Sequence, residues 1–313
     1  MQAPYGNNMF SIFVQVPAYR DWELSKTITD AIQKASGKYK INFGIHNCVI
    51  FPNEVPKPES TVEWAQVKYK ENIAPNNIGL QGARYIANEF YDNEDYYLQI
   101  DSHMRFVKDW DETLVLTINK YKELGINKPL ITQYPGNYKY DDNFNEVYDL
   151  MEPFHATQID FKENPQQFKD TLIPIQRAFP LENSCSYTKS VSGGFIFTLG
   201  IFSEIKPNPK IAFWGEEPLI AARAFTHGFD LVVPMAPFLW HLYHSGQPFY
   251  KTRRHHVWAD YPEIWAKMEI ESKEEYQRIF KDRVIGAEAL GSERTLEEYE
   301  EFSGLDFRTG NIV

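Results

Sequence analysis

Short apolar runs alternate with amphipathic stretches along the first half of the chain. Residues 10–16 form an apolar run that ends at Pro17 and predicts a buried strand, and residues 23–35 carry apolar side chains at helical spacing up to Gly37. A second apolar run over residues 40–50 predicts another strand. A strand, a helix and a strand in this order predict a parallel sheet with a right-handed crossover. Ligands of such sheets bind beyond the carboxyl ends of the strands.

The same alternation continues toward the C-terminus. It predicts further strands over residues 62–69, 96–100, 129–134, 156–161, 172–179, 192–200 and 231–235. It predicts further helices over residues 79–91, 110–124, 219–227, 269–284 and 292–302, the last with a capping box made by Thr295 and Glu298. Residues 136–153 are polar and aromatic without either period, and we expect an exposed loop or insertion there.

Asp101 and His103 directly follow the apolar run of residues 96–100. Side chains two positions apart on extended chain point the same way, so a carboxylate and an imidazole leave the end of the sheet together. That pair suits a divalent cation such as Mn²⁺, which accepts mixed oxygen and nitrogen ligands. The alternative is a helix-capping aspartate and a surface histidine. His241 follows a later predicted strand and is a candidate third ligand, although a lone histidine is more often structural.

Two further segments carry candidate ligand-binding residues. In the turn after the first strand, Pro17 to Asp21, Tyr19 could stack on a base, and Arg20 or Asp21 could bond polar ligand atoms. Taken alone, the turn favours an ordinary strand-to-helix connection with Asp21 as the N-cap. Arg84 follows a glycine-rich helix start, a place where an anion such as a phosphate can approach the backbone.

The second half of the chain adds glycines, carboxylates and a basic cluster. Gly193 and Gly194 directly precede a predicted strand. Paired glycines in this position suit either a wall that faces a ligand or a tight packing contact. Glu216 and Glu217 follow Trp214 and Gly215, where they could hold sugar hydroxyls or complement a helix dipole. The basic cluster at residues 251–256 could close over a diphosphate or form a solvated face.

Composition narrows the class of protein. The 313 residues are 43% hydrophobic and 24% charged, as is typical of a globular protein, and the net charge is −11. An acidic chain gains no general electrostatic help in binding duplex DNA or RNA. The two cysteines, Cys48 and Cys185, form no paired motif, and no apolar run has the length of a signal peptide core or a membrane span. We therefore expect a soluble, cytoplasmic protein.

The ordered combination of these motifs resembles glycosyltransferase family 60, the cytoplasmic polypeptide-hydroxyproline N-acetylglucosaminyltransferases. The likeness covers nearly the whole chain, although no single motif is specific. It rests on the strand at residues 12–16 with its Pro-Ala-Tyr-Arg-Asp turn, Gly82-Ala83-Arg84, Asp101-Ser102-His103, Gly193-Gly194-Phe195, Trp214-Gly215-Glu216-Glu217, His241-Leu242-Tyr243, and the segments 291–299 and 304–307. The chain is similar, more distantly, to the mucin-type polypeptide N-acetylgalactosaminyltransferases.

The resemblance implies a GT-A fold, in which one Rossmann-like mixed α/β sheet flanked by helices binds a nucleotide sugar. It implies a catalytic domain over residues 1–250, with the basic flap and a helical C-terminal extension over residues 251–313 packed on it. It also implies that Asp101, His103 and His241 bind Mn²⁺, with Mg²⁺ as a substitute.

The remaining site residues also follow from the resemblance. The donor-binding residues it implies are Pro17, Tyr19, Arg20, Arg84, Asp101, Gly193, Gly194 and Trp214. Arg253 and Arg254 would cover the diphosphate, and Glu217 and Glu216 would be the catalytic carboxylates, with Glu217 positioning substrate.

The implied activity is a retaining transfer of a hexose or pentose from a UDP-sugar, such as UDP-GlcNAc, to an acceptor hydroxyl, most simply on a protein. Phage enzymes that glycosylate hydroxymethylated pyrimidines in DNA give an alternative acceptor, and a non-catalytic module that binds nucleotide sugars or glycans is another. Metal-dependent hydrolysis is a further alternative for the same ligands. The sequence does not identify the sugar, a general base or the oligomeric state.

Overall fold

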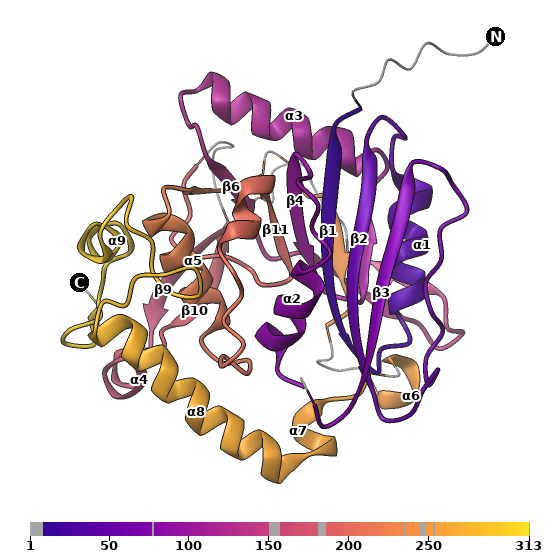
Figure 1. Ribbon diagram of the computed structural model, residues 1–313. Helices are drawn as coiled ribbons and strands as arrows, with labels where there is room; N and C mark the ends of the chain where they lie inside the picture. Colours follow the sequence, from indigo (N-terminus) through magenta and orange to yellow (C-terminus); the bar gives the residue numbers. More distant parts are fainter. Residues whose placement is uncertain are drawn as a thin grey trace.

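A computed structural model describes residues 9–76, 78–149, 157–180, 186–234, 236–243, 248–252 and 254–312. Its centre is a mixed sheet of seven strands in the order β12-β6-β11-β4-β1-β2-β3 (Figure 1). The strands are β1 (Ser11–Tyr19), β2 (Lys40–Val49), β3 (Ala65–Ile73), β4 (Tyr96–Ile100), β6 (Pro129–Thr132), β11 (Phe195–Leu199) and β12 (Asp230–Val232). β11 runs antiparallel to its neighbours β4 and β6, whereas β4, β1, β2 and β3 are mutually parallel. The predicted β-α-β start of the chain is confirmed.

Helices cover both faces of this sheet. The helices of the main layers are α1 (Leu24–Lys34), α2 (Leu80–Asn88), α3 (Trp110–Glu123) and α5 (Glu216–Thr226). Alternate side chains of β1 enter two separate cores: Val14 joins the core that contains Leu24 and Trp110, and Phe13 joins the core that contains Leu219. The period of two in the apolar runs therefore supplies both layers.

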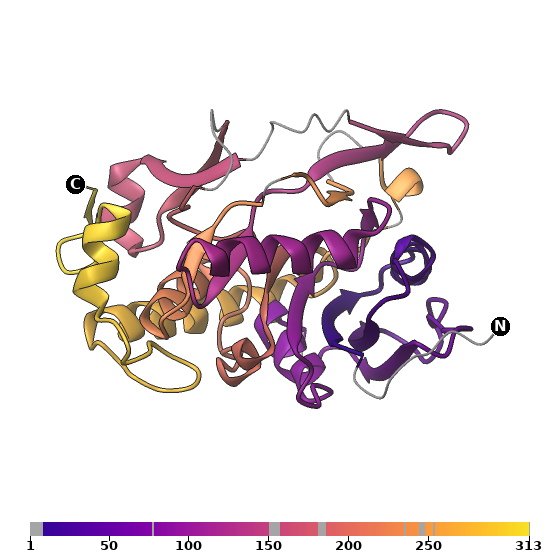
Figure 2. The same cartoon turned by 90° about the horizontal axis from the view of Figure 1, so that it is seen from above.

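The C-terminal part of the chain runs along one end of the molecule. It contains α6 (Phe249–Thr252), α7 (Val257–Asp260), α8 (Pro262–Lys281), α9 (Leu296–Ser303) and the short strands β14 (Leu305–Asp306) and β15 (Asn311–Ile312). α7 and α8 lie toward the opposite end of the molecule from α3 (Figure 1), and α3 is therefore in front when the molecule is seen from above (Figure 2). The predicted capping box of Thr295 and Glu298 begins α9. Tyr276 and Phe280 of α8 are fully buried in the second core, so this extension packs on the same body as the sheet.

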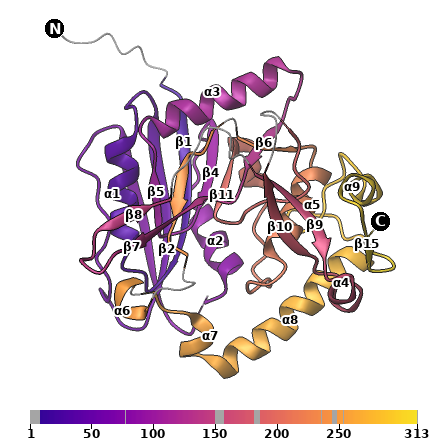
Figure 3. The same ribbon diagram turned by 180° about the vertical axis from the view of Figure 1, so that it is seen from behind.

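A second, smaller sheet lies beyond the end of β4. Its strands are β5 (Met104–Phe106), β13 (Leu239–His241), β7 (Gly136–Tyr140) and β8 (Glu146–Tyr148), in the order β5-β13-β7-β8. Figure 3 shows the β7–β8 hairpin crossing this side of the molecule. The expectation of an irregular loop over residues 136–153 is therefore wrong for the hairpin, although its turn is polar and exposed. The hairpin pairs Tyr138 with Tyr148, and these rings stack on each other.

A two-stranded ribbon completes the fold. β9 (Thr157–Glu163) and β10 (Ile175–Pro180) pair antiparallel, and α4 (Pro165–Thr171) connects them. The sequence predicted both strands but a polar turn instead of the helix. Asn164 caps this helix by accepting a hydrogen bond from the backbone of Gln167. Among the described residues, no helix is both long and apolar enough to cross a membrane.

Candidate functional site

Asp101, His103 and His241 converge where the two sheets meet. Asp101 follows β4, His103 precedes β5 and His241 ends β13. The Nε2 atoms of the two histidines lie 2.8 Å apart, and Nε2 of His241 lies 3.3 Å from Oδ2 of Asp101. One ligand atom from each residue falls within 4.8 Å of the others. The backbone fixes this arrangement, because Leu242 N–H donates to the carbonyl of His103 at 3.1 Å.

The surroundings of the two histidines suit them to bind a metal ion. Nδ1 of His103 lies 2.7 Å from Oδ2 of Asp21, so this carboxylate holds the ring proton on Nδ1 and leaves the Nε2 lone pair facing His241. Burial, with His103 adding to it, lowers the pKa of His241 to about 4, so its ring is neutral. Two imidazoles and one carboxylate fit a divalent transition-metal ion such as Mn²⁺ or Zn²⁺.

Asp21 has a role that the sequence did not reveal. Its Oδ1 accepts a hydrogen bond from the backbone of Glu23 at 2.9 Å, as expected of a residue at a helix start, while its Oδ2 also accepts from Ser102 Oγ at 2.6 Å. Burial by itself would raise the pKa of Asp21, but His103, Arg254 and Ser102 together lower this pKa below its ordinary value. The signal available in the sequence was position: Asp21 follows β1, and β1 is the parallel neighbour of β4.

Arg84 joins the carboxylates on the opposite side of Asp101. Its side chain is fully buried and donates to Glu216 Oε1 at 2.7 Å, to Asp101 Oδ1 at 3.1 Å and to the carbonyl of Gly193 at 2.8 Å. The predicted role of Arg84 was contact with the donor. Its guanidinium contacts protein groups, which suits it to orienting Asp101 and Glu216, and a contact of Arg84 with the donor stays a prediction. Burial would raise the pKa of Asp101, but His241 and Arg84 lower it below its ordinary value.

Gly193 and Gly194 are glycines for a steric reason. A Cβ atom on Gly194 would lie 2.9 Å from Oδ2 of Asp101, and one on Gly193 would lie 3.1 Å from Oε2 of Glu216. Gly194 precedes β11, whose Phe195 pairs with Ile100 just before Asp101. The two glycines therefore leave room for the two carboxylates.

Glu216 and Glu217 are the first two residues of α5, which begins three residues earlier than the predicted helix. Gly215, their N-cap, has φ 85°, and a Cβ there would meet the ring of Tyr276 at 2.7 Å, so a glycine is required. Glu217 accepts from the backbone of Gly193 at 2.8 Å and from Tyr134 Oη at 3.2 Å, and Gln176 also donates to it.

Both glutamates have pKa values above the ordinary value. Burial raises the pKa of Glu217 to about 8, with the neighbouring Glu216 adding to the rise. Burial also raises the pKa of Glu216, although Arg84 opposes it. A carboxyl group with a pKa near 8 is largely protonated at neutral pH, so Glu217 is poorly suited to accept a further proton.

A cavity of about 250 Å³ lies beyond the carboxyl ends of β1 and β2. Of the predicted donor residues, Pro17, Tyr19 and Asp101 line it, together with His103, His241 and Arg254. Aromatic side chains form its outer wall: Phe213, Trp258 and Trp265. We refer to this space as the first cavity. Arg254 also donates to the carbonyl of Leu242 at 2.5 Å, which places this residue of the predicted flap beside the histidines. Arg253 lies outside the described residues.

Arg20 does not line the first cavity. Its guanidinium forms ion pairs with Asp260 at 2.6 Å and with Glu54 at 2.5 Å. Tyr19 Oη donates to the same oxygen of Asp260 at 2.8 Å. These contacts fasten α7 to the end of β1, so Arg20 shapes the cavity from behind its wall.

A second cavity of about 340 Å³ adjoins the first, and Asp101, Leu80 and Phe213 line both. Its other lining residues include the remaining predicted site residues, Arg84, Gly193, Gly194, Trp214, Glu216 and Glu217. The ribbon contributes Gln176 and Ile175. Trp214, which is 62% exposed, also lines a third space of about 320 Å³ against α8. A continuous series of cavities therefore leads from β1 past Asp101 to α8.

Comparison with known proteins identifies the class of protein. Residues 51–309 match the family model described as "Glycosyltransferase (GlcNAc)". The chain therefore belongs to this glycosyltransferase family. No curated protein sequence matches the chain.

Solved structures of glycosyltransferases are similar in fold. A crystal structure of GalNAc-T7 with UDP, GalNAc and Mn²⁺ aligns with a TM-score of 0.51 and 15% sequence identity over 96% of this chain. This chain spans about half of that protein, 55% of its length. A crystal structure of Staphylococcus aureus TarS, residues 1–349, in complex with UDP-GlcNAc aligns with a TM-score of 0.39 and 11% identity, over 88% of this chain and 71% of that one. The likeness to GalNAc-T7 confirms the predicted GT-A architecture of a central mixed sheet flanked by helices.

Proposed function

We propose that this protein is a metal-dependent, retaining glycosyltransferase that moves a sugar from a UDP-sugar to a hydroxyl group of a protein. The observation that carries the proposal is the convergence of Asp101, His103 and His241 at the junction of the two cavities. A nucleotide in the first cavity would place its diphosphate beside these residues and its sugar in the second cavity. The family match and the UDP and Mn²⁺ held by GalNAc-T7 support the same arrangement.

The residues around the diphosphate suit the departure of a leaving group. When bound, a divalent cation offsets the negative charge that develops on the departing diphosphate. Asp101, His103 and His241 would hold this cation, and Arg254 would add positive charge from the side of the first cavity. Tyr19, held by Asp260, would pack against the nucleoside, while the aromatic outer wall would limit access of water.

The surroundings of the two glutamates favour retention of configuration. An inverting enzyme needs a charged carboxylate or another base to accept the acceptor proton. Glu217 is largely protonated at neutral pH, and Glu216 is engaged by Arg84 and Gln81. In the proposed reaction the bond from the sugar C1 to the phosphate oxygen breaks, and the acceptor oxygen bonds to C1 on the same face. The acceptor proton passes to the departing phosphate oxygen. Glu217 then orients the sugar or the acceptor.

A protein acceptor suits the second cavity better than DNA. Its lining carries the carboxyl groups of Asp101, Glu216 and Glu217, and its arginine, Arg84, is already paired with two of them. A polyanion would gain little from such a surface, as expected also from the net charge of −11. The exposed Trp214 gives a peptide an apolar contact beside the reacting groups.

The test is release of UDP from a panel of UDP-sugars with and without Mn²⁺, followed by mass spectrometry of candidate protein and DNA acceptors. We expect Mn²⁺-dependent release from at least one UDP-sugar and its loss in His241→Ala. The matched control is His227→Ala, because His227 follows the end of α5, its Nδ1 donates to the carbonyl of Arg223 at 2.8 Å, and it lines neither cavity. Failure of every UDP-sugar to bind or react with Mn²⁺ would overturn the proposal, and full activity in His241→Ala would remove His241 from the site. NMR of the product anomer tests retention.

A further inference from the structure

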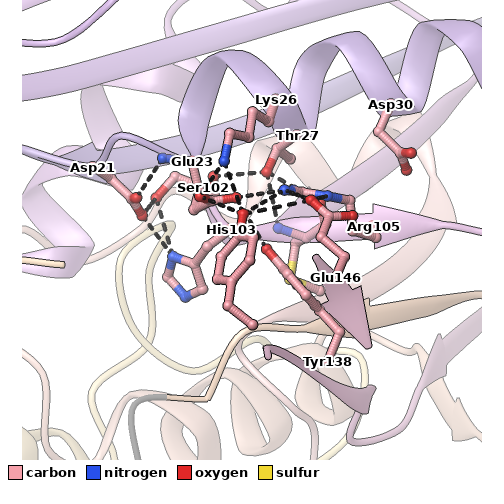
Figure 4. A network of polar contacts seen from close by, with 12 residues as sticks. Asp21, Glu23, Lys26, Thr27, Asp30, Ser102, His103, Arg105, Tyr138 and Glu146 are labelled. Atoms are coloured by element: carbon pink, nitrogen blue, oxygen red, sulfur yellow. Dashed lines mark hydrogen bonds and ion pairs between the residues drawn. The ribbon is translucent and has the colours of Figure 1, made fainter. Parts of the chain in front are cut away.

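Two acid–base pairs with the same spacing connect the start of α1 to the segment that contains His103. Asp21 faces His103, with Oδ2 2.7 Å from Nδ1. Two residues further along both segments, Arg105 Nη2 donates to Glu23 Oε2 at 2.5 Å. Figure 4 shows the two pairs next to each other. The first pair orients the candidate metal ligand directly, and the second lies immediately behind it.

Arg105 connects β5 to the far strands of the small sheet. Its side chain is 2% exposed. Nε and Nη2 donate to Oε1 of Glu146 on β8 at 3.0 and 2.6 Å, and the guanidinium lies over the ring of Tyr138 on β7, 4.8 Å from its centroid. β13, which carries His241, lies between β5 and β7 in this sheet. One side chain therefore holds together the strands on either side of β13.

Glu23 links the two pairs to each other. Its carboxylate is buried and accepts hydrogen bonds from Tyr138 Oη at 3.2 Å and Tyr140 Oη at 2.8 Å, in addition to that from Arg105. Its backbone N–H donates to Asp21 Oδ1 at 2.9 Å. A displacement of Glu23 would therefore move both the aspartate behind His103 and the partner of Arg105.

The other edge of β5 is held by α1 instead of a strand. Thr27 Oγ1 accepts from the backbone of Met104 at 2.9 Å and donates to the carbonyl of Ser102 at 2.8 Å. Asp30 Oδ2 accepts from the backbone of Phe106 at 2.6 Å. β5 is thus fixed by α1 on one edge and by β13 on the other, and the position of β5 against β13 sets the separation of the two histidines.

We propose that Arg105 and Glu23 are positioning residues that hold His103 and His241 at the separation a divalent cation requires. This inference rests on the proposed function. Neither residue lines the first or the second cavity, so both act through the histidines. Metal–ligand distances tolerate changes of only about 0.2 Å, and loss of a group that orients a ligand typically weakens metal binding about 10- to 100-fold.

The test is direct titration of the purified full chain with Mn²⁺, in which electron paramagnetic resonance measures the free ion. Arg105→Lys keeps the charge but loses the planar group that spans Glu23, Glu146 and Tyr138. We expect its dissociation constant for Mn²⁺ to rise about 10-fold. We also expect turnover of the UDP-sugar to recover at saturating Mn²⁺, because all three ligands are intact. Glu146→Gln, at a side chain 26% exposed, is a milder second variant that should weaken binding in the same direction.

Arg294→Lys is the matched control. Arg294 donates to Asp230 at 2.9 Å and lies over the ring of Phe225, 4.7 Å from its centroid, so it makes the same kinds of contact away from the cavities. Equal Mn²⁺ dissociation constants in wild type, Arg105→Lys and Arg294→Lys would overturn the positioning role alone. Failure of the wild-type protein to bind Mn²⁺ would overturn the metal dependence in the proposed function, and this inference with it.

Discussion

We expect Gly194→Ala, which adds one methyl group and leaves the three candidate metal ligands unchanged, to weaken metal binding. In Gly194→Ala the new Cβ would lie 2.9 Å from Oδ2 and 3.6 Å from Cγ of Asp101, and 3.9 Å from Cδ2 of His241. Attractive contacts between such atoms begin at about 3.5 Å, so the carboxylate oxygen must retreat by roughly half an ångström. The φ of Gly194 lies outside the left-handed region, so the expected effect of the substitution is steric.

The magnitude follows from what holds Asp101. Its Oδ1 accepts from Arg84 at 3.1 Å and its Oδ2 faces His241 at 3.3 Å, so a retreat strains both contacts. Overpacking of this kind costs about 1–3 kcal/mol of folding stability. The displacement exceeds the roughly 0.2 Å that metal–ligand distances tolerate. We therefore expect about a tenfold loss of Mn²⁺ affinity, equivalent to about 1.4 kcal/mol.

The assay is Mn²⁺ titration together with thermal unfolding of the same preparations. Gly82→Ala is the control, because a Cβ on this helical glycine of α2 would meet only the carbonyl of Pro209, at 3.8 Å. This variant should keep its Mn²⁺ affinity and gain about 0.5–1 kcal/mol of stability. An Mn²⁺ dissociation constant for Gly194→Ala that equals those of wild type and Gly82→Ala would refute the steric argument.

Two further predictions concern the wall of the first cavity and the protonation of the second. Asp260→Asn weakens the contacts through which Tyr19 and Arg20 hold α7 at the end of β1. Steady-state kinetics should therefore show KM for the UDP-sugar raised several-fold with a smaller change in kcat. An unchanged KM would contradict a role of these contacts in shaping the first cavity. Burial raises the folded-state pKa of Glu217 to about 8, so the folded protein binds more protons than the unfolded chain between pH 4.5 and 8, and stability falls as pH rises through this range. The unfolding temperature of Glu217→Gln minus that of wild type should therefore be larger at pH 8.5 than at pH 5. A difference that does not change with pH would contradict the raised pKa.

The sequence predicted the central sheet because strands such as β1 and β4 are buried on both faces. Such strands read as continuous apolar runs, as residues 12–16 and 96–100 do, and the polar residues that end them mark the ligand-binding edge. The β7–β8 hairpin gave no such signal. Stacked tyrosines and the contact of Glu146 with Arg105 hold it in place. Arg105 lies 41 residues earlier in the chain, so a local sequence pattern does not reveal this contact.

The sequence predicted which residues belong to the candidate site better than it predicted the contacts between them. Local sequence placed Asp101 and His103 at a strand end and made His241 and the two glutamates candidates, and the family resemblance joined them into one site. Arg84 and Arg20 look equally suited to an anion in the sequence, yet both are paired with carboxylates that are distant in sequence, Glu216 and Asp260. A basic residue beside a ligand edge therefore indicates a binding role only after its protein partners are known.

Residues from several elements of the fold constrain the carboxylate of Asp101. Arg84 from α2, Gly194 before β11 and His241 from β13 each constrain the same carboxylate, and Arg105 acts on the histidines from the other side. Changes that act on one shared group are not additive. If Gly194→Ala has already displaced the Asp101 carboxylate, loosening β5 with Arg105→Lys removes less additional affinity than it does in wild type. A double variant whose loss of Mn²⁺ affinity equals the full product of the single losses would show that the two sides of the site act independently.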